Sequence, residues 1–424
     1  MTENEFLFAT VNSGFNLVSH QLFRGAIILL ALITTACSGS ENNTGEPDHI
    51  RILDEIPEHI RELENLTIFP GDSEPRYSIE LIPEQAFGET GEPYLTTLYG
   101  AVEDDRGRVI IHNANTNHEH SIYVYNADGT YHTQIGGPGR GPGEFGFVIS
   151  VQASAGKVFA RDITNQRLNI YNTDDYSFVR SMMIEQLEIR NHEAVRGLQL
   201  GLILPRNDGN YQVSFSQRVS DTYWQKVIYL LMDSEGNTLD FEPVEFQSSP
   251  RAQGEMGGLM PTPFMGTTIT YTSDDGALYS AWNHDFLIRK HDANGDYQFA
   301  IYYPVTGSAF DLSYHTPTPF FDRDDVLRAI DKYDQKLPES NPIIDLLKVD
   351  DYNRIWAAVP MDPQRKVYEW WILGESGELL AKLQRPRNKT IFDIKNGYLY
   401  AKEIDEETDI EYVVKYRMEF REVR

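Results

Sequence analysis

The chain has one cysteine, Cys37, among its 424 residues. A single thiol excludes an internal disulfide, a zinc site built from several cysteines and a thiol–disulfide pair within the chain. The HExxH pattern of zinc proteases, a Walker phosphate loop and the Gly-x-Ser-x-Gly elbow of serine hydrolases are also missing from the sequence. We therefore predict no catalytic residue, no metal ligand and no cofactor from motifs.

Positive charge is scarce. The chain has 37 Lys and Arg against 64 Asp and Glu, which gives a net charge of −27. An acidic surface of this size repels phosphate backbones, and no basic stripe interrupts it. We therefore expect no nucleic-acid partner, and the simplest role of the acidity is solubility.

The apolar run at residues 25–33, GAIILLALI, has nine residues. It is too short to cross about 30 Å of hydrocarbon as a helix, but it suits the core of a secretory signal. Thr34-Thr35-Ala36-Cys37 follows and resembles the lipobox of bacterial lipoproteins, although Thr34 stands where Leu is usual. A buried apolar helix with an ordinary free Cys37 is the alternative.

The lipobox resemblance implies that Cys37 is acylated and becomes the mature N-terminus, which would bind the protein to a membrane through its lipid. Ser38 follows the cysteine, and lipoproteins with Ser at this position are similar to those sent to the outer membrane. We expect a signal peptide over 1–36, a lipidated tether with a short helix over 37–75, and a folded domain over 76–424. The expected location is the cell envelope.

Aromatic residues make up 12% of the chain, which favours half-buried strand faces. Six segments repeat one order of Asp/Asn/Gly turn, strand, polar loop and alternating strand. They are residues 104–135, 154–184, 207–241, 274–303, 350–383 and 395–420. One such sheet cannot bury both of its faces, whereas sheets stacked radially can. The pattern predicts an all-β fold, a six-bladed β-propeller. A strand at residues 76–81 would complete the last blade and close the ring, an expectation that comes from the usual closure of β-propellers by both termini and not from the spacing.

One helix is expected within residues 321–340. Val326, Leu327, Ile330, Tyr333 and Leu337 recur at helical spacing, and Pro338 ends the pattern. Asp322 or Asp324 would cap its start. The helix either covers an apolar patch on the propeller or acts as a lid over one mouth of the channel.

Residues 129–172 resemble the NHL repeat of β-propellers, and the chain as a whole is similar to six-bladed NHL- or TolB-like propeller lipoproteins of Bacteroidetes-type bacteria. The matching residues are Gly141, Gly143, Phe145, Gly156, Asp162, Asn165, Arg167 and Leu168. Only this copy, about a tenth of the chain, matches well, and the usual Pro after the Phe is missing. The resemblance implies the fold and says little about function.

Asp162 and Arg167 are expected to pair within one blade and to tie adjacent strands. The glycine-rich run 136–143 superficially resembles a phosphate cradle, but two prolines remove amides that a phosphate needs. It is more simply a connection between blades, from which Arg140 and Glu144 would face the channel mouth.

Other candidates for channel or rim binding are Trp282, His284, Arg354 and Trp356, with Asp285 beside His284. Each is more simply a core or rim residue. His112, His118 and His120 include a His-x-His pair that an ordered loop would let chelate a metal, but a solvated hairpin loop is the simpler interpretation. The acidic run 403–411 is interpreted as a charged hairpin tip.

Two functions remain open. The first is a non-enzymatic envelope lipoprotein whose propeller binds or scaffolds protein or glycan partners. The second is an enzyme, a lyase or hydrolase, which acts in the central channel and requires converging polar side chains with shifted pKa values. A channel filled by apolar side chains would exclude the second.

Overall fold

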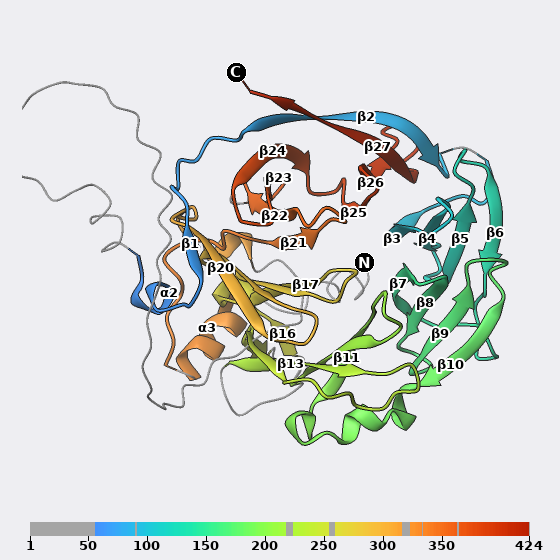
Figure 1. Ribbon diagram of the computed structural model, residues 1–424, viewed down its shortest axis with the longest axis horizontal. Coiled ribbons are helices and arrows are strands. Elements are labelled where there is room, and N and C mark those ends of the chain that lie inside the picture. The colour runs from blue at the N-terminus through green and yellow to red at the C-terminus, as the bar shows by residue number, and fades with distance from the viewer. Residues whose placement is uncertain are drawn as a thin grey trace, which may run out of the picture.

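The computed structural model describes residues 56–89, 91–217, 224–253, 259–315, 323–332, 334–362 and 364–423. Six sheets of at least four strands stand around a central axis, and Figure 1 views the ring along this direction. The chain is thus an all-β, six-bladed propeller, as the repeats predict. Residues 1–36 and Cys37 lie outside the described residues.

The first three blades follow one another in sequence, each with its innermost strand first. Blade 1 consists of β3 (Thr97–Glu103), β4 (Val109–Ala114), β5 (His120–Tyr125) and β6 (Tyr131–Ile135). Blade 2 consists of β7 (Val148–Ser154), β8 (Lys157–Asp162), β9 (Arg167–Asn172) and β10 (Phe178–Met183). Blade 3 consists of β11 (Gln199–Pro205), β12 (Tyr211–Ser216), β13 (Gln225–Met232) and β14 (Val244–Ser248).

The other three blades include two strands from the N-terminal side. Blade 4 consists of β17 (Thr268–Thr272), β18 (Leu278–Trp282), β19 (Phe286–His291), β20 (Tyr297–Tyr303) and β1 (Leu66–Ile68). Blade 5 consists of β21 (Leu346–Val349), β22 (Ile355–Pro360), β23 (Val367–Leu373) and β24 (Leu379–Pro386). Blade 6 consists of β25 (Ile391–Lys395), β26 (Tyr398–Ile404), β27 (Glu411–Glu422) and β2 (Tyr77–Phe87).

Short elements decorate the ring. Among the described residues they are the α-helices α2 (Glu58–Arg61) and α3 (Arg323–Lys332), the hairpin strands β15 (Arg251–Gln253) and β16 (Leu259–Pro261), and 3-10 helices at Ile184–Gln186, Glu188–Asn191, Glu193–Val195, Pro263–Met265 and Leu312–Tyr314. Ile56 and Ile60 pack on Leu287 and Tyr302, and β1 pairs in parallel with β20. Residues 56–68 therefore brace blade 4.

The ring closes with strands from both ends of the chain. β2 pairs antiparallel with β27, with Leu81 opposite Met418, and Figure 1 shows the blue strand beside the red one. The predicted strand at 76–81 is real but longer, because β2 continues to Phe87. Each repeat found in the sequence begins at or next to the turn after an inner strand. Four repeats reach the next three strands of their blade, whereas 207–241 ends before β14 and 395–420 leaves the outermost position of blade 6 to β2.

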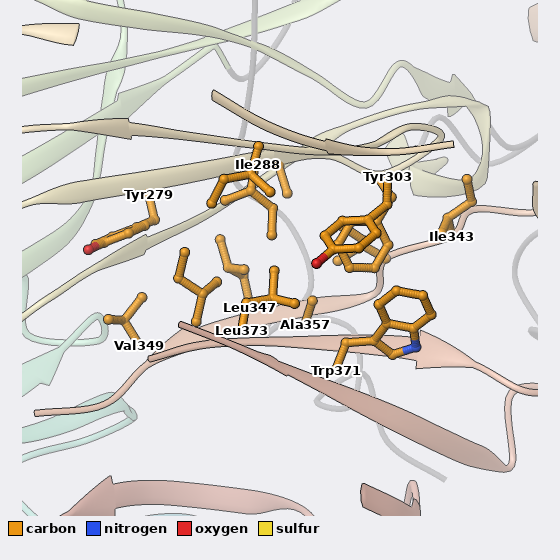
Figure 2. Close-up of a cluster of buried hydrophobic side chains, with 14 of the residues drawn as sticks. Tyr279, Ile288, Tyr303, Ile343, Leu347, Val349, Ala357, Trp371 and Leu373 are labelled. Carbon is orange, nitrogen blue, oxygen red and sulfur yellow. The ribbon is translucent and has the colours of Figure 1, made fainter. Parts of the chain in front are cut away.

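Apolar packing between neighbouring blades forms the core. Figure 2 shows the interface of blades 4 and 5, where Tyr279, Ile288 and Tyr303 of blade 4 meet Ala357 and Trp371 of blade 5. The rings of Tyr303 and Trp371 lie 5.4 Å apart and nearly perpendicular. Because both faces of a blade are apolar here, each sheet needs a neighbour on either side.

The glycine-rich run connects blades 1 and 2. Arg167 donates hydrogen bonds to the carbonyls of Gly141 and Glu144, at 2.9 and 2.7 Å. Asp162 accepts from the amides of Gly146 and Phe147, and its Oδ2 lies 3.7 Å from Arg167 Nε across β8 and β9. This arrangement fixes the connection to blade 2, and it uses polar groups that would otherwise be free to hold a ligand.

Helix α3 begins at Arg323, so Asp324 lies in its first turn rather than at its cap; Asp322 lies outside the described residues. Val326 and Ile330 are buried against Phe264 and Leu312. The helix contacts β15, and Figure 1 shows it toward the outer side of the ring. It covers an apolar patch, in agreement with the first of the two predicted roles.

The interpretation of residues 112–120 as a solvated histidine loop is wrong for His120. His118 is exposed in the turn, but His112 and His120 are 1% exposed and share a hydrogen bond of 2.8 Å between Nε2 and Nδ1. Phe147 packs on the His120 ring at 4.4 Å. Burial lowers the pKa of His112 well below its usual value and that of His120 to about 4, although Asp162 raises the latter.

This histidine pair predicts an acid-sensitive stability. The pKa of His120 is about 6.5 when unfolded and about 4 when folded, so the unfolded chain binds a proton first as pH falls. The free energy of unfolding is therefore highest above about pH 6.5. It decreases by about 3 kcal/mol as pH falls toward about 4. We expect His120→Gln to flatten the unfolding free energy between about pH 6.5 and 4, measured by denaturant titration.

The exposed His132, on outer strand β6, provides the matched control. His132→Gln should keep the slope of the wild-type protein in the same titration. An unchanged slope in His120→Gln would contradict the prediction.

Candidate functional site

The central channel contains a cavity of about 540 Å³. Its wall is made by the inner strands β3, β7, β11, β17, β21 and β25, and by the turns that follow them. Ser154 and Asn207 line it, whereas the glycine-rich connection lies at the other end of β7. The cavity thus opens at the mouth formed by the turns after the inner strands. The described residues that line this cavity are largely polar, and their side chains leave it open.

Four aspartates line this mouth on the side of blades 4 and 5, and we call it the acidic mouth: Asp274, Asp275, Asp350 and Asp351. They follow inner strands because each blade begins its next hairpin with an Asp/Asn turn. Asp350 is buried and accepts hydrogen bonds from Arg354 Nε at 2.7 Å and Trp356 Nε1 at 2.9 Å. It is a structural residue, whereas the other three carboxylates are exposed at the opening.

Two charged side chains lie deeper in the cavity wall. Lys348, on β21, donates from Nζ to the Phe392 carbonyl at 3.0 Å. Asp393, the next residue on β25, accepts from the amides of Glu103 at 3.1 Å and Ile394 at 2.9 Å. An amine from blade 5 and a carboxyl from blade 6 therefore lie near each other in the channel wall, where each influences the charge of the other.

Burial shifts the pKa values of this pair toward each other. It lowers the pKa of Lys348, an effect that Asp393 partly opposes, and raises the pKa of Asp393, which the Glu103 amide, Lys395 and Lys348 oppose. Tyr271, on β17, has its pKa raised by burial and by nearby carboxylates, and Lys348 Nζ lies 5.9 Å from its ring centre. These groups can orient a polar ligand and exchange protons with it.

Sequence reasoning missed Lys348, Asp393 and Tyr271. A usable signal existed, because Lys348 interrupts the apolar run Leu346–Val349 and Asp393 interrupts Ile391–Ile394, each just before a turn. A charged residue in the middle of a short apolar strand indicates that this side of the strand faces a polar space and not the apolar face of a neighbouring sheet. Which strand faces the channel, however, depends on the order of strands within the blade.

Arg140 and Glu144 belong to the connection between β6 and β7, before the end of β7 that is opposite the acidic mouth. Arg140 is exposed, and its carbonyl accepts from Arg167 at 3.3 Å. Glu144 is exposed too, and its Oε2 accepts from the Gly141 amide at 2.7 Å. A Cβ at Gly139 would displace this carboxylate from its present position. Their part in binding stays a prediction.

Trp282 and His284 lie at the end of β18 and just after it, away from the channel. Trp282 lines a cavity between blades 3 and 4, and its ring lies 5.9 Å from that of Trp224. His284 shares a hydrogen bond of 2.9 Å with the Phe264 carbonyl, and burial lowers its pKa. The structure thus separates these two residues from Lys348 and Asp393.

Arg354 and Trp356 belong to the packing of blade 5. Arg354 lies 4.7 Å from the Phe420 ring centre and pairs with Asp350. Trp356 is fully buried in the core between blades 5 and 6, so it reaches neither channel nor rim. Both follow a turn, but the strand after that turn is the second of the blade, whose faces meet neighbouring blades.

Within the described ranges, no group of three or more His, Cys, Asp or Glu side chains is arranged to hold a metal ion. The loop of the predicted acidic hairpin tip, residues 405–409, is exposed. Glu403 at its start is instead buried and pairs with Arg385 and Lys389 at 2.6 Å each. The acidic run is thus only partly a solvated tip.

Asp393→Asn tests whether the channel holds a strained charge. Burial raises the pKa of Asp393, so keeping it ionised costs folding free energy at neutral pH, and a neutral amide removes this cost. We expect a thermal midpoint a few degrees higher than wild type near pH 7, with the difference vanishing near pH 4. The exposed Glu406→Gln is the control, and a lower midpoint at pH 7 would refute the assignment.

Comparisons with known proteins agree with the architecture. A family model described as a 6-bladed beta-propeller matches residues 88–247, which span blades 1 to 3. The search of curated proteins found no match.

Three solved structures illustrate the likeness. A protein described as exported, from Bacteroides fragilis, is 13% identical with a TM-score of 0.49, covering 84% of this chain and 99% of that one. A catalytically inactive virginiamycin B lyase from Staphylococcus aureus with quinupristin is 11% identical, with a TM-score of 0.39 and coverage of 80% and 99%. Regucalcin, a calcium-binding protein from Agrobacterium tumefaciens, is 11% identical, with a TM-score of 0.38 and coverage of 84% and 98%. Similarity this low says nothing about the function of this chain. The family model and the structure together identify the chain as a six-bladed β-propeller.

Proposed function

We propose that the mature protein is a lipid-anchored module of the cell envelope that binds a glycan in the acidic mouth of its channel. The observation that carries the proposal is the open cavity, into which several blades send polar side chains. Preformed cavities with a few converging polar groups are the usual form of small-ligand sites.

The chemistry of the mouth suits sugar hydroxyls. Carboxylates accept two hydrogen bonds and side-chain amides both donate and accept, which matches neighbouring hydroxyl groups. Asp351 and Asn353 lie together on one turn, and Asn207 contacts Ser154 at 2.9 Å on another. Tyr352 between the first two is 61% exposed beside the cavity lining, with Arg354 5.0 Å from its ring centre, and it would extend the contact surface for a sugar.

The anchor is the second part of the proposal. The signal-like run, the lipobox-like residues before Cys37 and the polar stretch after it support export and acylation. Among described residues, no helix is long and apolar enough to span a membrane. A lipid on Cys37 would hold the propeller at the outer membrane. Arg140 and Glu144 would then be available to a protein partner at the opposite mouth.

An enzyme, a lyase or hydrolase, is the second candidate function. One observation favours it: Lys348 and Asp393 have pKa values shifted toward each other, in a cavity that also contains Tyr271. Such pairs serve as general acids and bases in many active sites. Turnover of the bound glycan would distinguish this function from plain binding.

Glycan binding is tested by thermal unfolding and calorimetry of residues 38–424 with oligomers of N-acetylglucosamine and of glucosamine. A ligand at a hundred times its dissociation constant adds about 2.7 kcal/mol to stability. We expect a raised midpoint with one series, and at least tenfold weaker binding by Asp393→Asn and by Asn353→Ala.

Glu406→Gln is the matched control and should bind as wild type does, because its side chain is exposed outside the cavity. Product analysis of the same mixtures separates an enzyme from a binder. If neither series raises the midpoint, the glycan proposal fails and a protein partner, sought by cross-linking in the envelope, becomes the leading alternative.

The anchor is tested by Cys37→Ser expressed in a bacterium with lipoprotein processing. We expect the wild-type protein in the membrane fraction, with a mass that shows cleavage before Cys37 and added acyl chains, and the variant in the soluble fraction. Cys37→Ser that still sediments with membranes, or a wild-type protein without acyl mass, would contradict lipidation.

A further inference from the structure

A larger cavity, of about 1170 Å³, lies between blades 3 and 4. One wall is the face of blade 4 that carries Ser280, Trp282, Leu287 and Arg289. The other walls come from β14 and from the brace around α2. This cavity is separate from the channel site, since the two share no lining residue, and a ligand here would bind whether or not the channel holds a glycan.

The two faces of blade 4 differ. Toward blade 5, as Figure 2 shows, Tyr279, Ile288 and Tyr303 pack in a continuous apolar core. Toward blade 3, the cluster of buried apolar residues contains one described residue of blade 4, Leu278, and the rest come from blade 3. Apolar packing therefore gives way here to a hollow, although a propeller depends on contact between blades.

A polar row replaces the missing apolar residues. Thr270, Ser280 and Arg289 lie opposite one another on β17, β18 and β19, so their side chains share one face. Ser280 lines the cavity and is 1% exposed, and its Oγ has no hydrogen-bond partner among the described residues. A buried hydroxyl without a partner is costly, which indicates that a ligand supplies the missing bond.

Arg289 provides a positive charge beside Ser280. Burial lowers its pKa, and Tyr297 and Asp285 oppose this shift, but a guanidinium stays protonated at neutral pH. Its planar group offers paired N–H donors that match a carboxylate. Arg289 and the Ser280 hydroxyl together form a recess for one anionic head group.

Apolar and aromatic side chains form the rest of the cavity. Trp282 is held by Gly266, where any Cβ would come within 2.6 Å of the indole. Leu287 follows on β19, and Phe246 and Tyr297 lie 5.8 and 5.7 Å from the His291 ring. These walls suit the apolar body of a ligand whose charged end lies at Arg289.

Other charged groups that face the cavity lie toward its opening. Lys226 pairs with Glu245 at 3.1 Å, and His59 lies 3.7 Å from Asp285. Glu62 and Glu64 on the brace are exposed. This rim favours entry of small molecules with a single buried charge over polyanions.

From this arrangement we propose a second binding site, between blades 3 and 4, for a small monocarboxylate with an apolar body, of the size of a medium-chain fatty acid. The carboxylate accepts hydrogen bonds from Arg289 and Ser280, and the chain lies along Leu287 and Trp282. Occupation completes the contact between two blades that the apolar core leaves open.

Decanoate, below its micelle concentration, is the probe, and decanol and decylamine are its uncharged and cationic counterparts. Binding to the whole mature chain is measured by calorimetry and by the fluorescence of Trp282, with Trp282→Phe to assign the signal. We expect decanoate to bind at least tenfold more tightly than decanol, and decylamine not to bind.

Arg289→Met should weaken decanoate binding tenfold or more without affecting decanol, and Arg289→Lys should restore part of the loss. Ser280→Ala should weaken decanoate several-fold, yet leave the midpoint of the ligand-free protein unchanged or higher, because it removes an unpaired hydroxyl. It provides the test if Arg289→Met does not fold. The exposed Arg421→Met on β27 is the matched control and should bind decanoate as wild type does.

Equal affinity for decanoate and decanol, or decanoate binding that survives both Ser280→Ala and Arg289→Met, would overturn the proposal. So would a decanoate-induced fluorescence change that persists when Trp282 and the neighbouring Trp224, whose ring lies 5.9 Å away, are both replaced by Phe.

Discussion

Apolar contact between neighbouring blades is the constraint on which this structure depends. Each sheet presents apolar side chains on both faces, so no blade can be stable alone and the ring must close. β2 provides the closure by pairing with β27, which joins residues more than 300 positions apart in sequence. The brace of residues 56–68 extends the same principle, since it covers the outer part of blade 4.

The candidate sites lie where this packing stops. Inner strands have no neighbouring sheet on their channel side, so Lys348 and Asp393 occupy positions that would be apolar elsewhere in a blade. Between blades 3 and 4 the apolar contact is incomplete, and Ser280 and Arg289 fill the gap with polar groups. Burial shifts the pKa values of charged side chains in both places. These buried polar groups reduce the stability of the fold, and they are also the groups that could bind a ligand.

The sequence predicted much of the architecture and little of the site. Turn residues and alternating strands identified six blades, whereas the closing strand at 76–81 was expected from the usual way in which β-propellers close. The pairing of Asp162 with Arg167, which ties adjacent strands of blade 2, was expected from the NHL-like repeat. By contrast, Arg354 and Trp356 were candidates for the channel or rim because they follow a turn. The strand after that turn is second in the blade, and Trp356 is buried.

What the sequence by itself determined is therefore local. Turn chemistry, strand alternation and the helical spacing around Val326 set which segments form which elements, because these depend on near neighbours in the chain. Only the tertiary structure decided that Lys348 of blade 5 lies near Asp393 of blade 6, that His120 is buried against His112, and that Ser280 lies in a cavity. Such contacts depend on the order of strands and the distance between blades, which result from packing the whole ring.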